Sequence, residues 1–354
     1  MRIAQIAPLC EAVPPLLYGG TERIVAYLCD SLVETGHDVT LFASAEARTG
    51  AKLVPMRDKA IRLDSFPLKS DTAAHLAMLD EVFRQSDDFD VLHFHIDLLQ
   101  FPMFKEIADH TLTTLHGRLD LKDLPAVYAR WPEYPLVSIS NSQRKPLPDA
   151  NWVATVQHGI PMQNFRFSPA AEGQYLAFLG RISPEKGPER AIAIARAAGV
   201  PLKIAAKVDA ADAIYFHRKI EPLLADPLVE YIGEISEGEK SEFLGNALAL
   251  LFPIDWPEPF GIVLIEAMAC GTPIIATNRG SVPEIVEHGV TGFVVNSHDE
   301  AVDAIGRLKT LNRLRIRHIC ERRFSAYAMA KRYLDVYARL VGGIVREDEL
   351  QDAV

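Results

Sequence analysis

The fold class follows from residues 247–276, which read ALALLFPIDWPEPFGIVLIEAMACGTPIIA. Residues 247–252 form a short, almost continuous apolar run, typical of a strand that is buried on both faces of its sheet. A proline-containing loop follows, then an apolar segment of helix length at residues 262–268, and then a second short apolar run at residues 273–276. A strand, a helix and another strand in this order predict one unit of a parallel sheet.

The same alternation of apolar runs and helical segments continues along almost the whole chain. In the first half we predict strands at residues 3–7, 39–43, 91–95, 112–116, 136–140 and 153–156. In the second half we predict them at residues 175–179, 202–206, 229–232, 247–252, 273–276 and 292–295. Two sets of about six strands predict an α/β protein with two doubly wound, Rossmann-like parallel sheets.

The alternation is interrupted at residues 165–173, just before the first strand of the second half. We therefore predict an N-terminal domain at residues 1–165 and a C-terminal domain at residues 166–324. A last amphipathic helix is predicted within residues 325–345, from where it could return to pack on the first domain. Two domains also agree with the length of 354 residues, more than twice the ~150 that are typical of one domain.

Composition and charge exclude several classes of protein. The chain has a formal net charge of −10, so it lacks the excess positive charge with which proteins bind nucleic acids or anionic lipids. It contains no apolar run near the ~18 residues of a transmembrane segment, and its first residues lack the apolar stretch of a signal peptide. Its 4 cysteines are scattered, which predicts reduced thiols and a cytoplasmic location.

Ligands of open parallel sheets bind beyond the carboxyl ends of the strands, so motifs that follow a predicted strand are candidates for a site. Gly19 and Gly20 follow the first strand and open a helix. Two glycines at a helix start let backbone N–H groups approach a phosphate or a sugar. A plain turn is the alternative explanation.

Arg181 and Lys186 follow the first strand of the second half, within Gly180-Arg181-Ile182-Ser183-Pro184-Glu185-Lys186-Gly187. One lies at a strand end and the other near a helix start, so two fixed cations could hold a diphosphate there. The alternative is that both are solvated surface charges.

The most specific motif runs from Glu258 to Glu266. Its proline-stiffened loop aims the Glu258 carboxylate and the N–H groups of Phe260, Gly261 and Ile262 at one ligand. Glu266 lies in a helix of otherwise apolar composition, and a buried carboxylate needs a partner. It could bond another part of the same ligand, such as ribose hydroxyls.

Two patterns resemble phosphate or metal sites and are set aside. Gly233 and Gly238-Glu239-Lys240-Ser241 nearly form a P-loop, but a glutamate separates the glycine from the lysine. Asp88 and Asp90 match a D-x-D metal motif, but they precede a predicted strand and so lie at the wrong end of the sheet.

Two further clusters have a chemical and a plain explanation. His93, His95 and Asp97 alternate along one strand, so the two imidazoles share a face and could hold a metal. Hydrogen-bonded structural histidines are the plain explanation, and they explain the pattern better. The arginines of the second cluster could touch a membrane, but a solvated helix end explains them better; they are Arg313, Arg315, Arg317, Arg322 and Arg323.

In their order and spacing, the motifs resemble the retaining glycosyltransferases of family 4. That family has the GT-B fold, with two Rossmann-like domains that face each other across a cleft and a C-terminal helix that crosses back to the first domain. The resemblance covers nearly the whole chain. Besides the motifs above it rests on Gly36-His37-Asp38-Val39, Thr114-Leu115-His116-Gly117, Ser140-Asn141-Ser142, His158-Gly159-Ile160, Ala269-Cys270-Gly271-Thr272-Pro273-Ile274 and Gly289-Val290-Thr291-Gly292-Phe293.

The resemblance implies roles for matching residues. Catalytic roles fall on Glu258, His116, Arg181 and Lys186: the two cations neutralise the leaving diphosphate, Glu258 holds hydroxyls of the donor sugar, and His116 contacts the sugar being transferred. The implied donor-binding set is Gly19, Gly20, Arg181, Lys186, Ile235, Glu258, Phe260, Gly261, Ile262 and Glu266, with the Ile235 backbone on the base and Glu266 on the ribose. His95 and Asn141 are candidates for the acceptor side.

The implied activity is transfer of a hexose from a nucleotide sugar to a hydroxyl acceptor, with retained configuration and with no metal or cofactor. We expect Glu258 to position the sugar and not to attack it. A UDP-sugar is the preferred donor and a GDP-sugar the next, while the acceptor could be a sugar, a lipid-linked molecule or a small molecule. Lys207 stands where that family commonly has a small residue, which puts the donor's placement near this loop in doubt. A nucleotide-sugar epimerase or hydrolase of the same fold, and a non-catalytic nucleotide-sugar binding protein, stay open as alternatives.

Overall fold

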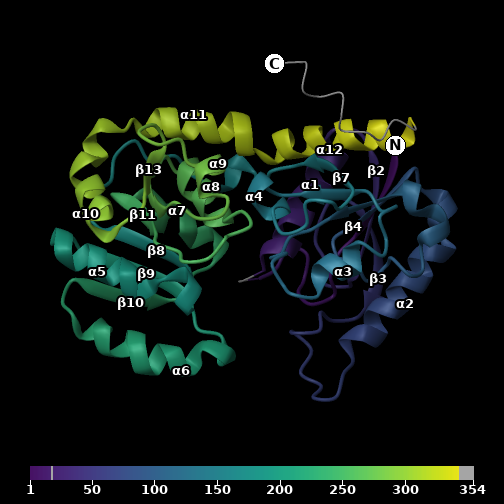
Figure 1. Ribbon diagram of the computed structural model, residues 1–354, viewed down its shortest axis with the longest axis horizontal. Helices are drawn as coiled ribbons and strands as arrows, with labels where there is room; N and C mark the ends of the chain where they lie inside the picture. Colours follow the sequence, from purple (N-terminus) through teal and green to yellow (C-terminus); the bar gives the residue numbers. More distant parts are fainter. Residues whose placement is uncertain (17–18, 343–354) are drawn as a thin grey trace. The chain divides into compact units, whose positions relative to one another are not determined.

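The computed structural model describes residues 1–16 and 19–342, and these form two compact units (Figure 1). The first unit comprises Met1–Gly159 together with the C-terminal helix α12 (Ala326–Val341). The second unit comprises Ile160–Ser325. Each unit contains one parallel sheet with helices between its strands, so the predicted fold class is confirmed.

The sheet of the first unit has the strand order β3-β2-β1-β4-β5-β6-β7. The order reverses between β1 and β4, which makes the gap between these two strands the topological switch point of the sheet. The strands are β1 (Arg2–Ile6), β2 (Asp38–Ser44), β3 (Lys52–Arg57), β4 (Val91–Phe94), β5 (Thr111–Thr114), β6 (Leu136–Ser138) and β7 (Trp152–Thr155).

The helices of the first unit cover this sheet with apolar side chains. They are α1 (Gly20–Glu34), α2 (Asp71–Arg84), α3 (Leu124–Tyr128), α4 (Asn141–Arg144) and α12. Helix α12 packs against α1 and β4 and buries Tyr333 and Tyr337 completely. Helix α12, the last one that the structure describes, is therefore part of the core of the first unit.

The sheet of the second unit has the order β10-β9-β8-β11-β12-β13, with its switch point between β8 and β11. The strands are β8 (Leu176–Arg181), β9 (Leu202–Lys207), β10 (Val229–Gly233), β11 (Ala249–Phe252), β12 (Ile274–Thr277) and β13 (Gly292–Val295). The helices are α5 (Pro188–Ala198), α6 (Ala213–Tyr215), α7 (Glu237–Gly245), α8 (Ile262–Ala269), α9 (Val282–Ile285), α10 (His298–Arg307) and α11 (Arg313–Phe324). An apolar core of its own holds this unit together.

One strand, β3, was not predicted from the sequence. It forms the edge of the first sheet, its residues are half-buried or exposed, and it contains Pro55. Such a strand lacks the continuous apolar run by which the others were recognised. Within residues 1–16 and 19–342, no helix combines the length and the apolar composition that crossing a bilayer requires.

Candidate functional site

The switch point of the second sheet brings together motifs that are far apart in the sequence. After β8 the chain passes through a short turn of 3₁₀ helix, Pro184–Lys186, and enters α5 through Gly187, whose φ of 68° is one that glycine adopts without strain. After the neighbouring strand β11 comes the loop that carries Glu258 and leads into α8. The predicted cations and the predicted carboxylate thus follow two adjacent strands.

Lys186 and Glu258 form an ion pair at this point, between Nζ and Oε2. Trp256 donates a hydrogen bond from Nε1 to the same oxygen at 3.1 Å, and the lysine ammonium lies 5.1 Å from the centre of the Trp256 ring. Glu258 is 8% exposed. Both contacts use Oε2, so the Oε1 atom is the one that remains for a ligand among the residues that the structure describes.

The segment that follows β12 packs against the loop that carries Glu258 and hydrogen-bonds to its backbone. Ser281 donates from its backbone N–H to the Glu258 carbonyl at 3.0 Å, and from its hydroxyl to the Phe260 carbonyl at 2.7 Å. A Cβ atom on Gly280 would lie 2.4 Å from both the backbone N and the backbone O of Glu258, and the φ of Gly280 is +56°. Close packing of this glycine therefore fixes the Glu258 backbone. Neither Gly280 nor Ser281 was predicted from the sequence.

Glu266 is 3% exposed, and its partner is Lys240. The Lys240 ammonium on α7 lies 2.7 Å from Glu266 Oε1 and 3.0 Å from Glu237. Lys240, the lysine of the P-loop-like pattern, therefore has another role than binding phosphate. It neutralises Glu266, the carboxylate that is predicted to bind ribose. As with Glu258, the contact with lysine uses one carboxylate oxygen.

Arg181 ends β8 among carboxylates. Its Nη2 donates to Glu185 Oε1 at 2.5 Å, and Asp209 and Asp212 lie 3.7 Å away. Lys207 is its register partner at the end of β9, and pairs with Asp209 at 3.0 Å. Two cations thus lie side by side at this edge of the sheet, balanced by acidic groups.

The start of α8 supplies backbone N–H groups. Gly261 is its N-cap residue with φ 84°, and a glycine has no side chain with which to cap this end. The first N–H groups of a helix lack partners within it, so they are available to an anion or a hydroxyl. Phe260 is 2% exposed, and Ile235 is partly buried in the loop between β10 and α7.

In the first unit the predicted residues also follow strand ends. Gly19 is the N-cap residue of α1 and Gly20 its first residue. His95 directly follows β4, and His116 comes two residues after β5. Asn141 is the exposed first residue of α4, and its Oδ1 accepts a hydrogen bond from Thr155 at 3.3 Å.

Four histidines at this edge form a cluster, in which three are buried and His116 is partly buried. His95 Nδ1 lies 2.9 Å from His116 Nε2, and the His116 ring stacks on His158 with 5.2 Å between centroids. His93 is completely buried beside them, 4.1 Å from His95 between centroids. The sequence predicted a site role for His95 and His116, but not that they touch.

Burial keeps these imidazoles neutral. It lowers the pKa of His116 to about 3, and it lowers the pKa of His93, His95 and His158 well below the ordinary value. The neighbouring imidazoles act in the same direction for the last three.

Asp90 and His93, from the two motifs that resemble metal sites, are paired with other side chains of the protein. Asp90 begins the turn into β4 at the amino end of the sheet, where it pairs with Arg2 at 2.9 Å. His93 is hydrogen-bonded to Tyr337 and Thr114 at 2.7 Å each. No group of three or more metal-binding side chains is arranged around a common point within residues 1–16 and 19–342.

The interpretation of the arginine cluster as a solvated helix end was wrong for three of its members. Arg313 donates to the carbonyls of Ser168, Gly245 and Ala247 and to the Thr272 hydroxyl, at 2.7–3.0 Å. Its burial lowers its pKa to about 10. Arg317 and Arg323 likewise donate to backbone carbonyls, and so fasten α11 to the rest of the second unit.

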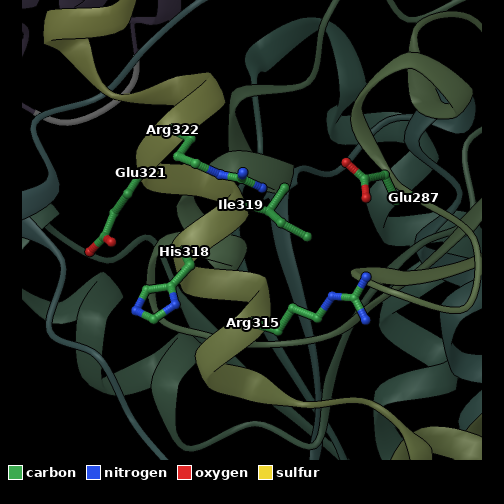
Figure 2. Close-up of a pocket in the computed structure, with 6 residues that line it drawn as sticks. All are labelled: Glu287, Arg315, His318, Ile319, Glu321 and Arg322. Carbon is green, nitrogen blue, oxygen red and sulfur yellow. The ribbon is translucent and has the colours of Figure 1, made fainter.

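The other two arginines line a cavity of about 520 Å³ beside α11. Figure 2 shows Arg315 and Arg322 extending toward the side where Glu287 lies, with Ile319 between them. His318 and Glu321 complete the lining from the other side of the helix. None of these residues belongs to the predicted site, and Arg315 and Arg322 are exposed, as the interpretation of a solvated helix end expects.

Comparison with known families matches both halves of the chain. The model for glycosyl transferases group 1 matches residues 162–323, and the model for glycosyltransferase family 4 matches residues 18–154. Together they include the switch-point residues of the second unit and the strand-end residues that follow β4 to β6 in the first.

Curated relatives are glycosyltransferases and a related synthase. Phosphatidyl-myo-inositol mannosyltransferase of Mycolicibacterium smegmatis is 25% identical over 335 residues, which cover 84% of this chain and 82% of the relative. D-inositol 3-phosphate glycosyltransferase of Thermobispora bispora is 30% identical over 225 residues, covering 55% and 52%. Alpha-maltose-1-phosphate synthase of Mycobacterium tuberculosis is 28% identical over 196 residues, covering 48% and 50%. The chain therefore spans about half the length of the last two relatives.

Solved structures show the same fold. A glycosyltransferase involved in avilamycin A biosynthesis matches with a TM-score of 0.72 and 24% identity, over 97% of this chain and 99% of that one. Anabaena HepE, solved in complex with UDP and glucose, matches with a TM-score of 0.73 and 17% identity, over 96% and 99%. Because each half is matched by a family model and the whole chain shares the GT-B fold of these structures, the chain belongs to the group 1, or family 4, glycosyltransferases.

Proposed function

We propose that the protein transfers a hexose from a nucleoside-diphosphate sugar to a hydroxyl acceptor, with retention of configuration and without a metal. One observation carries the proposal: Lys186 and Glu258, which follow neighbouring strands at the switch point of the second sheet, are in direct contact. A switch point is where open parallel sheets bind nucleotides. A cation and a carboxylate held together there can serve a diphosphate and a sugar at once.

The electrostatics of the second unit support a departing diphosphate. Glycosyl transfer leaves negative charge on the leaving phosphates, and preorganised cations stabilise that charge. Lys186 and Arg181 are held in place by carboxylate partners before a ligand arrives, so little reorganisation is needed. The start of α8, which follows the Glu258 loop, adds the positive end of a helix with its first N–H groups.

Glu258 serves in this proposal as a positioning group. Its Oε2 atom is engaged by Lys186 and Trp256, and its backbone is fixed by Gly280 and Ser281. A carboxylate held in this way can hold sugar hydroxyls through Oε1. The proton of the acceptor hydroxyl then goes to the leaving phosphate, and no bond forms between the sugar and the protein.

The donor carries a nucleoside diphosphate, with a UDP-sugar preferred over a GDP-sugar. A structural neighbour, HepE, was solved with UDP and glucose, which supports the uridine choice. The acceptor is a molecule with a free hydroxyl, either a sugar, a lipid-linked molecule or a small molecule.

The test incubates the protein with UDP-glucose, UDP-galactose, GDP-mannose and ADP-glucose, alone and with pools of hydroxyl acceptors. Nucleoside diphosphate that rises only with acceptor supports transfer, and the anomeric signal of the product in NMR reports retention. A sugar isomer formed without acceptor would show an epimerase, and diphosphate released without acceptor a hydrolase. Binding without any turnover would show a binding protein. Unchanged rates in EDTA are expected.

Lys186→Met tests the assigned cation, with Lys309→Met as the matched control. Both changes remove one ammonium, but Lys309 is exposed and outside the predicted site. Loss of a preorganised charge partner typically costs about 100-fold in kcat or more. We expect that loss from Lys186→Met alone, and equal activities of the two variants would contradict the assignment.

A further inference from the structure

The histidine cluster of the first unit belongs to a hydrogen-bonded chain that reaches the C-terminal helix. Gln5 on β1 donates from Nε2 to the Tyr337 hydroxyl at 3.0 Å. Its amide oxygen lies 2.8 Å from His95 Nε2, and His95 in turn contacts His116 at 2.9 Å. All of these groups belong to the first unit, and all except His116 are 3% exposed or less.

The chain has a direction, because each group can make only certain hydrogen bonds. The Gln5 amide oxygen can only accept, so His95 Nε2 must carry a proton and donate. A neutral imidazole has one proton, so His95 Nδ1 is an acceptor. The bond between the two rings then requires His116 Nε2 to donate.

The same reasoning leaves His116 Nδ1 without a proton. This nitrogen is buried and has no hydrogen-bond partner among the residues that the structure describes. Buried polar atoms without partners are rare in folded proteins and call for an explanation. A bare ring nitrogen can only accept, so the missing partner must be a donor such as a hydroxyl.

A second branch of the chain agrees with this direction. The Tyr337 hydroxyl accepts from Gln5 and so donates to His93 Nδ1 at 2.7 Å. His93 Nε2 then donates to Thr114 at 2.7 Å, and the Thr114 hydroxyl donates to Tyr333 at 2.9 Å. Each bond in the two branches then has one donor and one acceptor.

We infer that Tyr337 and Gln5 act through His95 as positioning residues that hold His116 in its Nε2-protonated tautomer, so that Nδ1 accepts a hydrogen bond from a ligand hydroxyl. Tyr337 orients the Gln5 amide, and the amide oxygen then sets the proton on His95. Toward the ligand, His116 in this state is a fixed hydrogen-bond acceptor at Nδ1, while its Nε2 donates to His95. That the hydroxyl belongs to the transferred sugar rests on the proposed function, but the tautomer itself does not.

The test measures the tautomer directly by ¹⁵N NMR of the full chain labelled at histidine. Long-range ¹H–¹⁵N spectra distinguish protonated from bare ring nitrogens, and His116→Gln identifies the signals of His116. At pH 7 we expect a protonated Nε2 and a bare Nδ1. A proton on Nδ1 would overturn the inference.

Tyr337→Phe and its matched control Tyr333→Phe test the relay. Both remove one hydroxyl from a buried tyrosine of α12, but the Tyr333 hydroxyl bonds to Thr114, at the far end of the other branch. Without Tyr337 the Gln5 amide can reverse, so we expect His116 to become a mixture of both tautomers, while Tyr333→Phe leaves it unchanged. Equal spectra of the two variants would refute the relay.

A second variant keeps the inference testable if Tyr337→Phe does not fold. Gln5→Met removes the accepting oxygen at similar side-chain length, and it should likewise release His116 into a tautomer mixture. A single Nε2-protonated tautomer in Gln5→Met would refute the role of Gln5. These spectra need no substrate, so a failure of the proposed transfer reaction and a failure of this inference are distinguishable.

Discussion

The buried His116 imidazole predicts a specific acid sensitivity of the first unit. In the unfolded chain a histidine has a pKa near 6.5 and takes up a proton as the pH falls, whereas burial holds the folded His116 pKa at about 3. Below pH 6.5 the unfolded state therefore binds more protons than the folded state. The folded state loses stability as the pH falls.

The magnitude follows from the two pKa values. Between pH 7 and pH 5 the unfolded imidazole goes from mostly neutral to almost fully protonated, while the folded one stays neutral. Linkage gives a loss of about 1.9 kcal/mol in the free energy of unfolding for this single residue. Because both pH values lie well above the folded pKa, the result depends almost entirely on the unfolded chain.

The assay is urea unfolding at pH 7 and at pH 5, in a Trp256→Phe background. The remaining tryptophans, Trp131 and Trp152, both lie in the first unit, so their fluorescence reports that unit alone. His116→Gln should reduce the pH-dependent loss by about 1.9 kcal/mol relative to the background protein. His110→Gln removes an exposed imidazole of the same unit and should leave the loss unchanged.

The reasoning is refuted if His116→Gln and the background protein lose the same free energy between the two pH values. His116 would then take up a proton in the folded state, and its ring nitrogens would not be as deeply desolvated as the structure has them.

Three further predictions concern the second unit, with unfolding followed by its own tryptophan after those of the first unit are replaced by phenylalanine. Glu258→Gln should lower kcat about 100-fold through loss of sugar positioning, and near-normal turnover with normal donor KM, or a glycosyl adduct trapped on the residue, would contradict that role. Gly280→Ala should destabilise the unit by about 2 kcal/mol or more, since its Cβ would lie 2.4 Å from the Glu258 backbone. The control Gly306→Ala on α10 has open space for its Cβ and should stabilise the unit by about 0.5–1 kcal/mol. A higher urea midpoint for Gly280→Ala than for Gly306→Ala would contradict the close packing of Gly280. Arg313→Met should lower the free energy of unfolding by about 2–4 kcal/mol, because it leaves buried carbonyl acceptors unpaired. Arg315→Met should lower it by less than about 0.5 kcal/mol. Similar free energies of unfolding for the two variants would argue against the stabilising role of the Arg313 hydrogen bonds.

The strands were predictable wherever both of their faces are buried, because such a strand needs a continuous run of apolar residues. Strands β8 and β11 are examples. The edge strand β3 was not, because one neighbour and half-exposed side chains demand no such run. The meeting of Lys186 and Glu258 was predictable in outline, since both follow strands of one parallel sheet.

The partners of the site residues were not predictable from the sequence. Glu266 signalled by its apolar surroundings that it needed a partner, but nothing in the spacing named Lys240 on another helix. Gly280 looks like any loop glycine until its distance from the Glu258 backbone is known. The Arg313 guanidinium bonds mainly to backbone carbonyls, which every residue has, so no sequence pattern marks those contacts.

The return of α12 to the first unit makes the second unit an insertion into the first. The insertion is closed at its base, where Ile160 bridges to Ser325 and its N–H donates to the Phe324 carbonyl at 2.9 Å. During synthesis, residues 160–325 are complete while the first unit still lacks the helix that carries Tyr333 and Tyr337. The second unit can therefore finish folding on the ribosome before the first, although it is made later. The same closure means that a short linker from Gly159 to Ala326 could yield the first unit as a separate protein.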